Sequence, residues 1–149
     1  MASPNYSVEQ VLPHAPPMVL LDELIDYGNE ALTAAVTIRN DSLFLQSEGV
    51  PSYVAIEYMA QAVAAYGGVE ALNEHRPVRI GYLLGTRNFA SKVPFFRVGD
   101  RLIVRVSVIY VDALSSFACQ ILVDEEIVAE ANLSVYQPVE EADQAVIDI

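Results

Sequence analysis

Three polar side chains stand out in this sequence because they occur in apolar segments. Glu57 is the single charged residue between Val50 and Val69, and Gln61 follows it one helical turn later. His14 lies in the proline-rich segment PHAPP, immediately before an apolar run. Carboxyl and imidazole groups are common proton-transfer groups in enzymes. The sequence therefore predicts an acid–base site, with Glu57 and His14 as its candidate catalytic residues.

The surroundings predicted for Glu57 favour such a role. Glu57 lies about one turn after a helix start, where the helix dipole stabilises a carboxylate. Apolar neighbours act in the opposite direction, because they disfavour the charged form. A carboxyl group held between these influences suits proton transfer. Backbone N–H groups at Ser52 to Val54 would be able to polarise a carbonyl oxygen of a substrate. The alternative is that Glu57, Gln61, Tyr53 and Ala64 form a polar stripe that faces solvent.

The two histidines and the single cysteine are the other residues that could carry chemistry. His75, in the polar segment NEHRP, is expected in solvent, whereas His14 is either a base or, as is more common beside an apolar run, a hydrogen-bonded structural residue. Cys119 is the single cysteine and is predicted to be a buried core residue. The sequence contains no phosphate-binding glycine loop, nucleophile elbow or Cys/His metal motif, so no metal site is predicted.

One long helix would position Glu57. The segment from Gly49 to Leu72 is almost entirely apolar, and Pro51 and Ser52 suit a helix start. A helix that is apolar on nearly every side is expected to be enclosed by the rest of its domain. Glu57 and Gln61 interrupt the run, which excludes a membrane span.

The rest of the chain has strand patterns. Leu32, Ala34, Val36 and Ile38 alternate with more polar residues, which predicts a strand with one buried face. Further strands are predicted in VRIGYLLGTRNFASKV, RLIVRVSVIYV, SSFACQILV and IVAEANLSVYQ, and the last two are joined by a hairpin at residues 124–126. We therefore expect one α+β domain over residues 1–137, with one helix and five to six mostly antiparallel strands, followed by an acidic, frayed segment at 138–149.

Charge is distributed unevenly along the chain. The net charge of -12 argues against nucleic acid as a partner. Residues 76–105 contain seven basic residues and one acidic residue, whereas acidic residues dominate before and after them. This basic segment is either a docking surface for an acidic or phosphorylated partner or a source of ion pairs within the fold. The first residues show no secretory signal, and we expect a cytoplasmic protein.

Three motifs resemble those of the β-hydroxyacyl-acyl carrier protein dehydratases. LPHAPPMVLLDELIDY is similar to their opening motif, IEYMAQAVA to a segment of their central helix, and FASKVPFFRVGDRLIVRV to a strand pair. The matches occur in order and cover most of residues 11–137. The sequence looks closest to the ApeP group, which is linked to bacterial aryl-polyene biosynthesis. The resemblance implies a hotdog fold, in which a curved antiparallel sheet wraps a long helix, and dimers of such domains.

The resemblance also implies roles for particular residues. Glu57 matches the carboxylate that protonates the departing hydroxyl of a β-hydroxyacyl thioester, and Gln61 matches a glutamine of the same motif. Ser52 and Tyr53 lie where backbone donors bind the thioester carbonyl, so we expect them, with Gln61, to bind substrate. No cofactor is implied, because the substrate arm is the phosphopantetheine of an acyl carrier protein or coenzyme A. The residues expected to dock the acidic carrier protein are Arg87, Lys92 and Arg97.

One residue departs from the pattern. Leu43 stands where these dehydratases have the histidine that removes the α-proton, and leucine cannot perform that step. Either His14 substitutes for it, or a second hotdog subunit supplies the histidine in a heterodimer; a homodimer is the alternative assembly. Two other functions are compatible with the missing histidine: an acyl-thioester hydrolase of the same fold, and a non-catalytic subunit of a heteromeric dehydratase.

Overall fold

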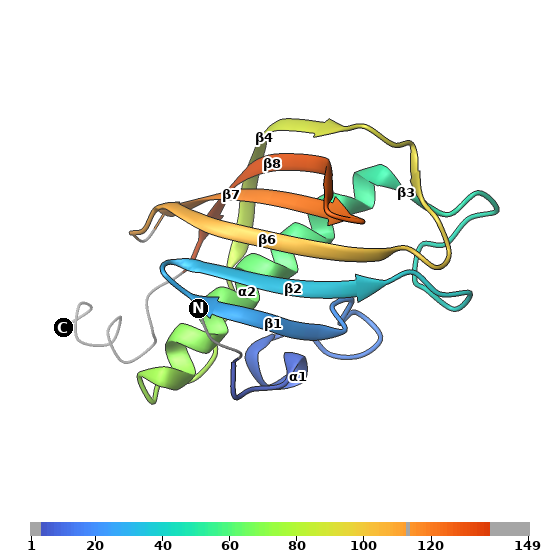
Figure 1. Ribbon diagram of the computed structural model, residues 1–149. Helices are drawn as coiled ribbons and strands as arrows, with labels where there is room; N and C mark the ends of the chain where they lie inside the picture. Colours follow the sequence, from blue (N-terminus) through green and yellow to red (C-terminus); the bar gives the residue numbers. More distant parts are fainter. Residues whose placement is uncertain (1–3, 113, 138–149) are drawn as a thin grey trace.

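The computed structural model describes residues 4–112 and 114–137. Its main feature is a six-stranded antiparallel sheet with the strand order β1-β2-β6-β7-β8-β4 (Figure 1). The strands of this sheet are β1 (Glu23–Gly28), β2 (Ala31–Thr37), β4 (Tyr82–Ser91), β6 (Arg101–Tyr110), β7 (Leu114–Val123) and β8 (Glu126–Tyr136). The other elements are α1 (Val8–Val11), β3 (Val50–Pro51), the 3-10 turn η1 (Ser52–Val54), α2 (Ala55–Asn73) and β5 (Phe95–Phe96).

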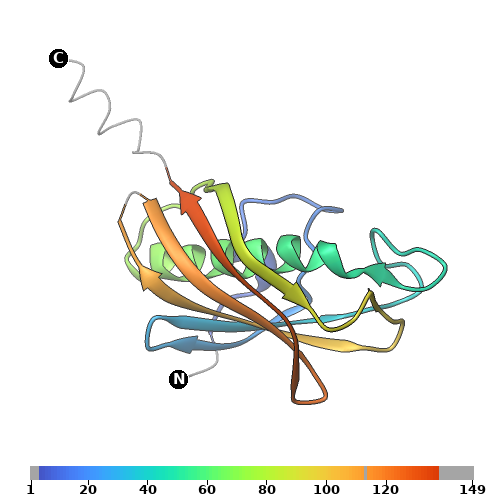
Figure 2. The ribbon, with the colours of Figure 1, turned by 90° about the horizontal axis from the view of Figure 1, so that it is seen from above.

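The long helix α2 lies against the concave face of the sheet. Figure 2 shows the curved strands passing across α2. Eleven of the nineteen α2 residues are buried, and they pack on side chains from β2, β6, β7 and β8. The largest fully buried side chains include Phe96, Leu102 and Met59. The predicted α+β class, the enclosed helix and the hotdog fold are therefore confirmed.

The helix start is built by tertiary contacts as well as by local sequence. Pro51 precedes η1, which runs directly into α2, as the sequence predicted. The short strands β3 and β5 pair with each other and fix this start against the segment around Phe96. Gly49 allows the pairing, because its φ is +132° and a Cβ atom there would lie 2.3 Å from the carbonyl oxygen of Phe96.

Strand β2 differs from the prediction in one respect. The alternating residues of β2 are buried, but Thr33 and Ala35 on its other face are buried too. Their side chains are short, and longer residues stand beside them on the neighbouring strands: Arg105 is opposite Thr33, and Ile103 is opposite Ala35. Cross-strand neighbours of this kind cover a small side chain without a second layer of structure.

Strand β4 lies at one edge of the sheet and carries exposed apolar residues. It pairs only with β8 in the main sheet, and its register shifts twice, between Leu83 and Gly85 and between Arg87 and Ala90. The strand predicted in this segment is therefore a single one with two irregularities. The hairpin between β7 and β8 is also as predicted, with Asp124 and Glu125 at positive φ. The segment 138–149, predicted to be frayed, lies outside the described residues.

The short helix α1 packs closely on α2. Gly68 of α2 lies against the backbone of Val11, where a Cβ atom on the glycine would be 2.0 Å from the Val11 carbonyl oxygen. This approach brings the chain that follows α1, including His14, alongside the long helix. Within residues 4–112 and 114–137, no helix has the length and apolar character needed to cross a membrane.

Candidate functional site

A pocket of about 640 Å³ runs along one side of α2. Glu57, Ala60, Ala64 and Gly67 line it at helical spacing. Its opposite wall comes from β4, β7 and β8 and from Val111 and Asp112, which follow β6. These helix residues are half-buried, in contrast to the buried residues on the other sides of α2. The apolar helix is therefore enclosed on all sides except the one that lines this pocket. Glu57 lies on this open side.

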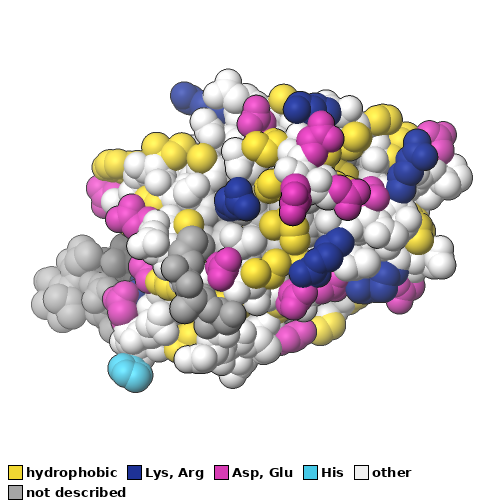
Figure 3. Space-filling view, viewed as in Figure 1, with side chains coloured by type: hydrophobic (Ala, Val, Ile, Leu, Met, Phe, Trp, Pro, Cys, Tyr) yellow, Lys and Arg dark blue, Asp and Glu magenta, His cyan; other side chains and the backbone are white. Residues whose placement is uncertain are grey.

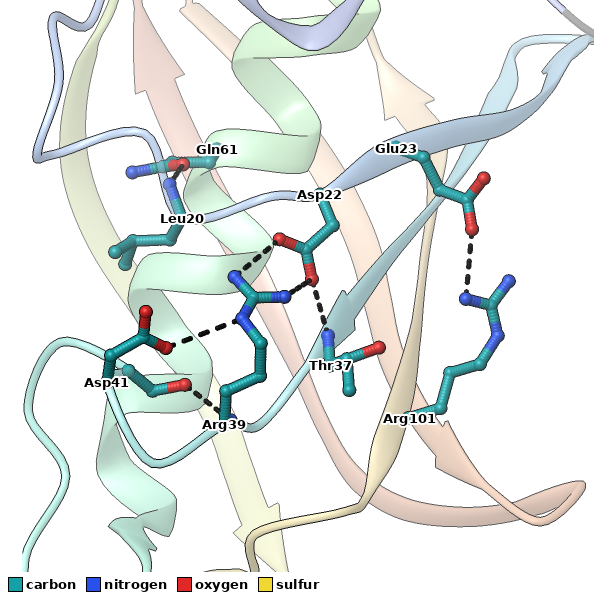
Figure 4. A network of polar contacts seen from close by, with 9 residues as sticks. Leu20, Asp22, Glu23, Thr37, Arg39, Asp41, Gln61 and Arg101 are labelled. Atoms are coloured by element: carbon teal, nitrogen blue, oxygen red, sulfur yellow. Dashed lines mark hydrogen bonds and ion pairs between the residues drawn. The ribbon is translucent and has the colours of Figure 1, made fainter.

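The side chain of Gln61 holds Glu57 in place. Nε2 of Gln61 donates hydrogen bonds to Oε1 of Glu57 (3.2 Å) and to the carbonyl oxygen of Met18 (2.6 Å). Oε1 of Gln61 accepts a hydrogen bond from the backbone N–H of Leu20 at 2.8 Å (Figure 4). Gln61, which we expected to bind substrate, is fully buried in this chain. It instead fixes Glu57 and joins the segment after His14 to the helix.

Asp22, which we did not single out from the sequence, anchors the other end of that segment. Its Oδ2 accepts a hydrogen bond from the backbone N–H of Thr37 at 2.6 Å, and both of its oxygens accept from the guanidinium of Arg39 at 3.2 Å (Figure 4). The fork geometry orients both partners. Gln61 and Asp22 thus attach residues 18–22 to α2 and to the end of β2. Thr37 and Arg39 are 15 and 17 residues away from Asp22 along the chain, so no local pattern identified the role of Asp22.

His14 lines the same pocket as Glu57. The structure therefore places in one pocket the two residues that the sequence suggested for acid–base chemistry. Nδ1 of His14 is buried and has no hydrogen-bond partner among the described residues. A structural histidine beside an apolar run usually has such a partner. The position leaves both interpretations of His14, as a base and as a structural residue, in place.

The far end of the pocket contains a second carboxyl group, Glu70. The hydroxyls of Tyr27 and Tyr66 both donate hydrogen bonds to it, the latter at 3.5 Å. The two tyrosine rings stack with their centroids 5.7 Å apart, and Phe117 meets the ring of Tyr66 edge-on. Burial raises the pKa of Glu70, the nearby Glu74 raises it further, and Arg76 lowers it. Sequence reasoning missed this group, because Tyr27 is 43 residues away along the chain.

The start of the helix offers fewer free donors than expected. The N–H of Ser52 donates to the carbonyl oxygen of Pro94 at 3.0 Å, so this donor is already used. The side chain of Tyr53 is exposed, and neither Ser52 nor Tyr53 lines the pocket that contains Glu57. The structure thus places these two residues at the helix start but outside the pocket.

Leu43 lies in an exposed loop and does not line the pocket of Glu57. Phe44 beside it is also exposed and has a φ of 71°. The position at which the resembling dehydratases carry their histidine is therefore separate from the carboxyl group of the same chain.

The basic residues of the segment 76–105 divide into two groups. Arg76 pairs with Glu74 at 3.2 Å and Arg101 with Glu23 at 2.9 Å. The expected docking residues, Arg87, Lys92 and Arg97, are exposed and form no ion pair with the residues that the structure describes. Figure 3 shows that the basic side chains on the face it presents are spread out and interleaved with acidic ones.

A second pocket, of about 580 Å³, lies beside the start of the helix. Arg97 lines it, together with residues 45–49 and 93–95. Lys92 and Arg97 flank this last segment, whose Pro94 carbonyl binds the helix start. No group of three His, Cys, Asp or Glu residues suited to a metal ion is found in residues 4–112 and 114–137.

Comparisons with known proteins concern the family and the fold of this chain. The family described as "ApeP-like: ApeP dehydratase" matches residues 6–147. A chain of "The Dehydratase Heterocomplex ApeI:P from Xenorhabdus doucetiae" is 28% identical, with a TM-score of 0.86 over 97% of this chain and 99% of that one. No curated protein matches the sequence.

More distant structures share the fold alone. A mutant of the phenylacetic acid degradation protein PaaI from Thermus thermophilus is 13% identical, with a TM-score of 0.60 over 78% of this chain and 92% of that one. A hypothetical thioesterase with coenzyme A from Streptococcus pneumoniae is 12% identical, with a TM-score of 0.60 over 79% of this chain and 89% of that one.

Proposed function

This chain belongs to the ApeP-like dehydratase family, and we propose that it supplies the acid of an active site that dehydrates a 3-hydroxyacyl thioester. The observation that carries the proposal is the position of Glu57, which lines a long pocket and is held by the buried side chain of Gln61. The acyl group would be attached to the phosphopantetheine arm of an acyl carrier protein in the cytoplasm, during fatty-acid-like or aryl-polyene chain synthesis.

The reaction requires a base and an acid on the two sides of one bond. The base removes the proton from the carbon next to the thioester carbonyl. The electron pair of that C–H bond forms the new carbon–carbon double bond, and the bond from the β-carbon to its hydroxyl breaks. Glu57, in its protonated form, donates its proton to the departing hydroxyl, which leaves as water. A backbone amide at the helix start, other than the bonded amide of Ser52, stabilises the negative charge that develops on the thioester oxygen.

We assign the base to a second hotdog subunit. Leu43 cannot accept a proton, and its loop does not line the pocket of Glu57. The similar chain comes from a heterocomplex, which supports an assembly of this kind here. A pair of unlike subunits would then hold one complete site, with Glu57 from this chain and the histidine from the other. His14 is the alternative base, because it lines the same pocket as Glu57.

The edge strand β4 is the surface that we assign to this partner. Ile80, Tyr82 and Leu84 are 55%, 53% and 60% exposed along this edge. An exposed apolar edge strand favours pairing with another strand. The other edge, β1, carries the charged residues Glu23 and Asp26 instead. Gly81 and Leu83 also line the pocket, so a subunit bound at β4 would border it.

The interface has a direct test. Leu84→Lys places a charge on the apolar edge and should separate the two subunits in size-exclusion chromatography of the co-expressed pair. Glu126→Lys, at the exposed hairpin, introduces a similar charge elsewhere and should leave the pair intact. A pair that survives Leu84→Lys would exclude β4 as the interface.

Arg87, Lys92 and Arg97 are the residues that we assign to carrier docking. Carrier proteins are acidic, and these three cations have no ion pair within the described part of this chain. Changing Arg87 and Lys92 to Glu should weaken carrier binding and raise the apparent KM, most strongly at low salt. Equal carrier binding by the wild type and the double variant at low salt would contradict the assignment.

The function itself is tested with the purified co-expressed pair and 3-hydroxyacyl thioesters. We expect an enoyl product, and a loss of about 10²–10⁴-fold in kcat for Glu57→Gln. A pair that keeps full activity with Glu57→Gln would show that this chain is a non-catalytic subunit. Release of free thiol from plain acyl thioesters, without enoyl product, would instead identify an acyl-thioester hydrolase.

A further inference from the structure

We propose that the far end of the α2 pocket, at Glu70, recognises a hydroxyl group at the end of a long acyl chain. This inference rests on the proposed function, since it takes Glu57 as the position of the reacting carbons. It adds a requirement on the substrate that the dehydration step itself does not impose. The proposal depends on three properties of the pocket: its length, the open space at Gly67 and the unused hydrogen-bonding capacity of Glu70.

The length of the pocket follows from its lining residues. Glu57 and Glu70 both line it and are thirteen residues apart on one continuous helix. At 1.5 Å per residue, the two positions are separated by about 20 Å along the helix axis. An extended chain advances about 1.2 Å per chain atom, so about sixteen atoms span this distance. A short acyl group at Glu57 would leave the far end empty.

The middle of the pocket has room for such a chain. Ala60, Ala64 and Gly67, which have little or no side chain, line the pocket between the two carboxyl groups, beside the larger Val63 and Tyr66. A Cβ atom added at Gly67 would meet nothing within 4 Å. Glycine costs helix stability relative to alanine, and no close contact requires it at position 67. The open space beside Gly67 is therefore available to a ligand.

The far end differs in chemistry from the middle. Tyr66 and Phe117 provide aromatic walls there, and Glu70 provides hydrogen-bond acceptors. A carboxylate can accept about four hydrogen bonds, and Tyr27 and Tyr66 supply two. The bond from Tyr66 is long at 3.5 Å, so a ligand donor can compete with it. An acyl chain ending in a methyl group would leave this capacity unused, whereas a terminal hydroxyl would donate to Glu70.

A hydroxyl fits the mixture of donors and acceptors at this end better than an ammonium group. Glu30, Glu74 and Asp112 line the same region as Glu70, and so do Arg76 and Arg79. A hydroxyl can donate to a carboxylate and accept from a guanidinium, whereas an ammonium group has no acceptor to offer the arginines. The preferred ligand is thus a largely apolar acyl chain of about sixteen atoms with a neutral donor at its end.

The test measures binding, so it does not depend on turnover. Amide-linked acyl pantetheine analogues with and without a terminal hydroxyl, matched in length, are titrated calorimetrically into the full chain and into the co-expressed pair. We expect the hydroxylated analogue to bind about three- to tenfold more tightly, as one additional hydrogen bond implies. Glu70→Gln should reduce this preference and Glu70→Met should abolish it. Glu126→Gln, which removes an exposed carboxyl group outside the pocket, is the control and should keep the preference.

A separate substitution tests whether the ligand must be long. Gly67→Leu fills the open middle of the pocket and should weaken binding of the long analogues at least tenfold, while Gly67→Ala should have a smaller effect. Equal affinity for the two matched analogues, or a preference that survives Glu70→Met, would overturn the inference and leave the proposed function standing. Failure of both analogues to bind would overturn the inference and the proposed function together.

Discussion

Gln61 and Glu57 lie one turn apart on α2, and Nε2 of Gln61 donates a 3.2 Å hydrogen bond to Oε1 of Glu57. The same nitrogen binds the carbonyl oxygen of Met18. The orientation of the carboxyl group is therefore set by a buried amide that is itself fixed by the backbone. This bond leaves Oε2 of Glu57 available to the pocket, where the proposed reaction requires its proton.

Gln61→Met should lower kcat about 10- to 100-fold with little change in KM, because Glu57 remains but loses the group that orients it. The variant should also lose roughly 2 kcal/mol or more of unfolding free energy, since the backbone groups of Met18 and Leu20 lose their partner. Steady-state kinetics and denaturant unfolding measure the two effects.

A control separates positioning by Gln61 from a general loss of stability. Ala62 follows Gln61 on α2 and lies on a different side of the helix from Glu57, about 140° around its axis. The change Ala62→Gly costs about 1 kcal/mol of helix stability. We expect its kcat to stay near the wild-type value. If Ala62→Gly lowers kcat as much as Gln61→Met does, the positioning role of Gln61 is wrong.

His14→Phe distinguishes the two proposed sources of the base. Because we assign the base to a second subunit, kcat of the co-expressed pair should fall less than about tenfold. A loss of that size is expected when a residue that lines the pocket is replaced but no catalytic group is removed. Loss of a true general base would cost about 10²–10⁴-fold and would remove one limb of the pH profile. A loss of that size, with the protein still folded by circular dichroism, would assign the base to His14 and refute the split site.

The sequence predicted the elements well and their contacts less completely, for a physical reason. The helix from Ala55 to Asn73 and the strand alternation around Leu102 depend on patterns within a few residues. The use of the Ser52 amide by Pro94 depends on pairing between β3 and β5, which lie more than forty residues apart. A free backbone N–H and a bonded one have the same local sequence. The sequence therefore could not show that the N–H of Ser52, which we expected to be free, binds Pro94.

The candidate site was also predicted only in part, because some of its residues act through partners that are distant in the sequence. Glu57 was identified because a single carboxyl in an apolar helix is visible in the sequence alone. Asp22 and Glu70 are also carboxyl groups, but each acts through partners that the fold brings from elsewhere: Thr37 and Arg39 for Asp22, and Tyr27 for Glu70. Such roles require knowledge of which strands lie against which helix.

The thiol of Cys119 should be unreactive in the folded protein. Burial raises the pKa of this thiol to about 12, so almost no reactive thiolate is present at pH 8. We expect labelling by a disulfide reagent such as Ellman's reagent at pH 8 to be at least about a thousandfold slower than for an unfolded chain. Labelling should become fast and stoichiometric in denaturant, so that it reports unfolding. Rapid labelling of the native protein at low denaturant would contradict the buried position of Cys119.

The adjacent glycines of α2 should respond in opposite ways to alanine. A Cβ atom at Gly68 would lie 2.0 Å from the backbone oxygen of Val11, so Gly68→Ala must push α1 away from the helix. Overpacking of this kind typically costs about 1–3 kcal/mol, and a backbone neighbour places Gly68→Ala at the upper end.

Gly67→Ala meets nothing within 4 Å and should gain up to about 1 kcal/mol from the better helix propensity of alanine. For a protein of this size these changes correspond to shifts of about 2–4 °C in Tm per kcal/mol. Thermal unfolding of the two variants side by side measures the difference, and a Gly68→Ala variant as stable as Gly67→Ala would show that α1 does not pack on α2 in this way.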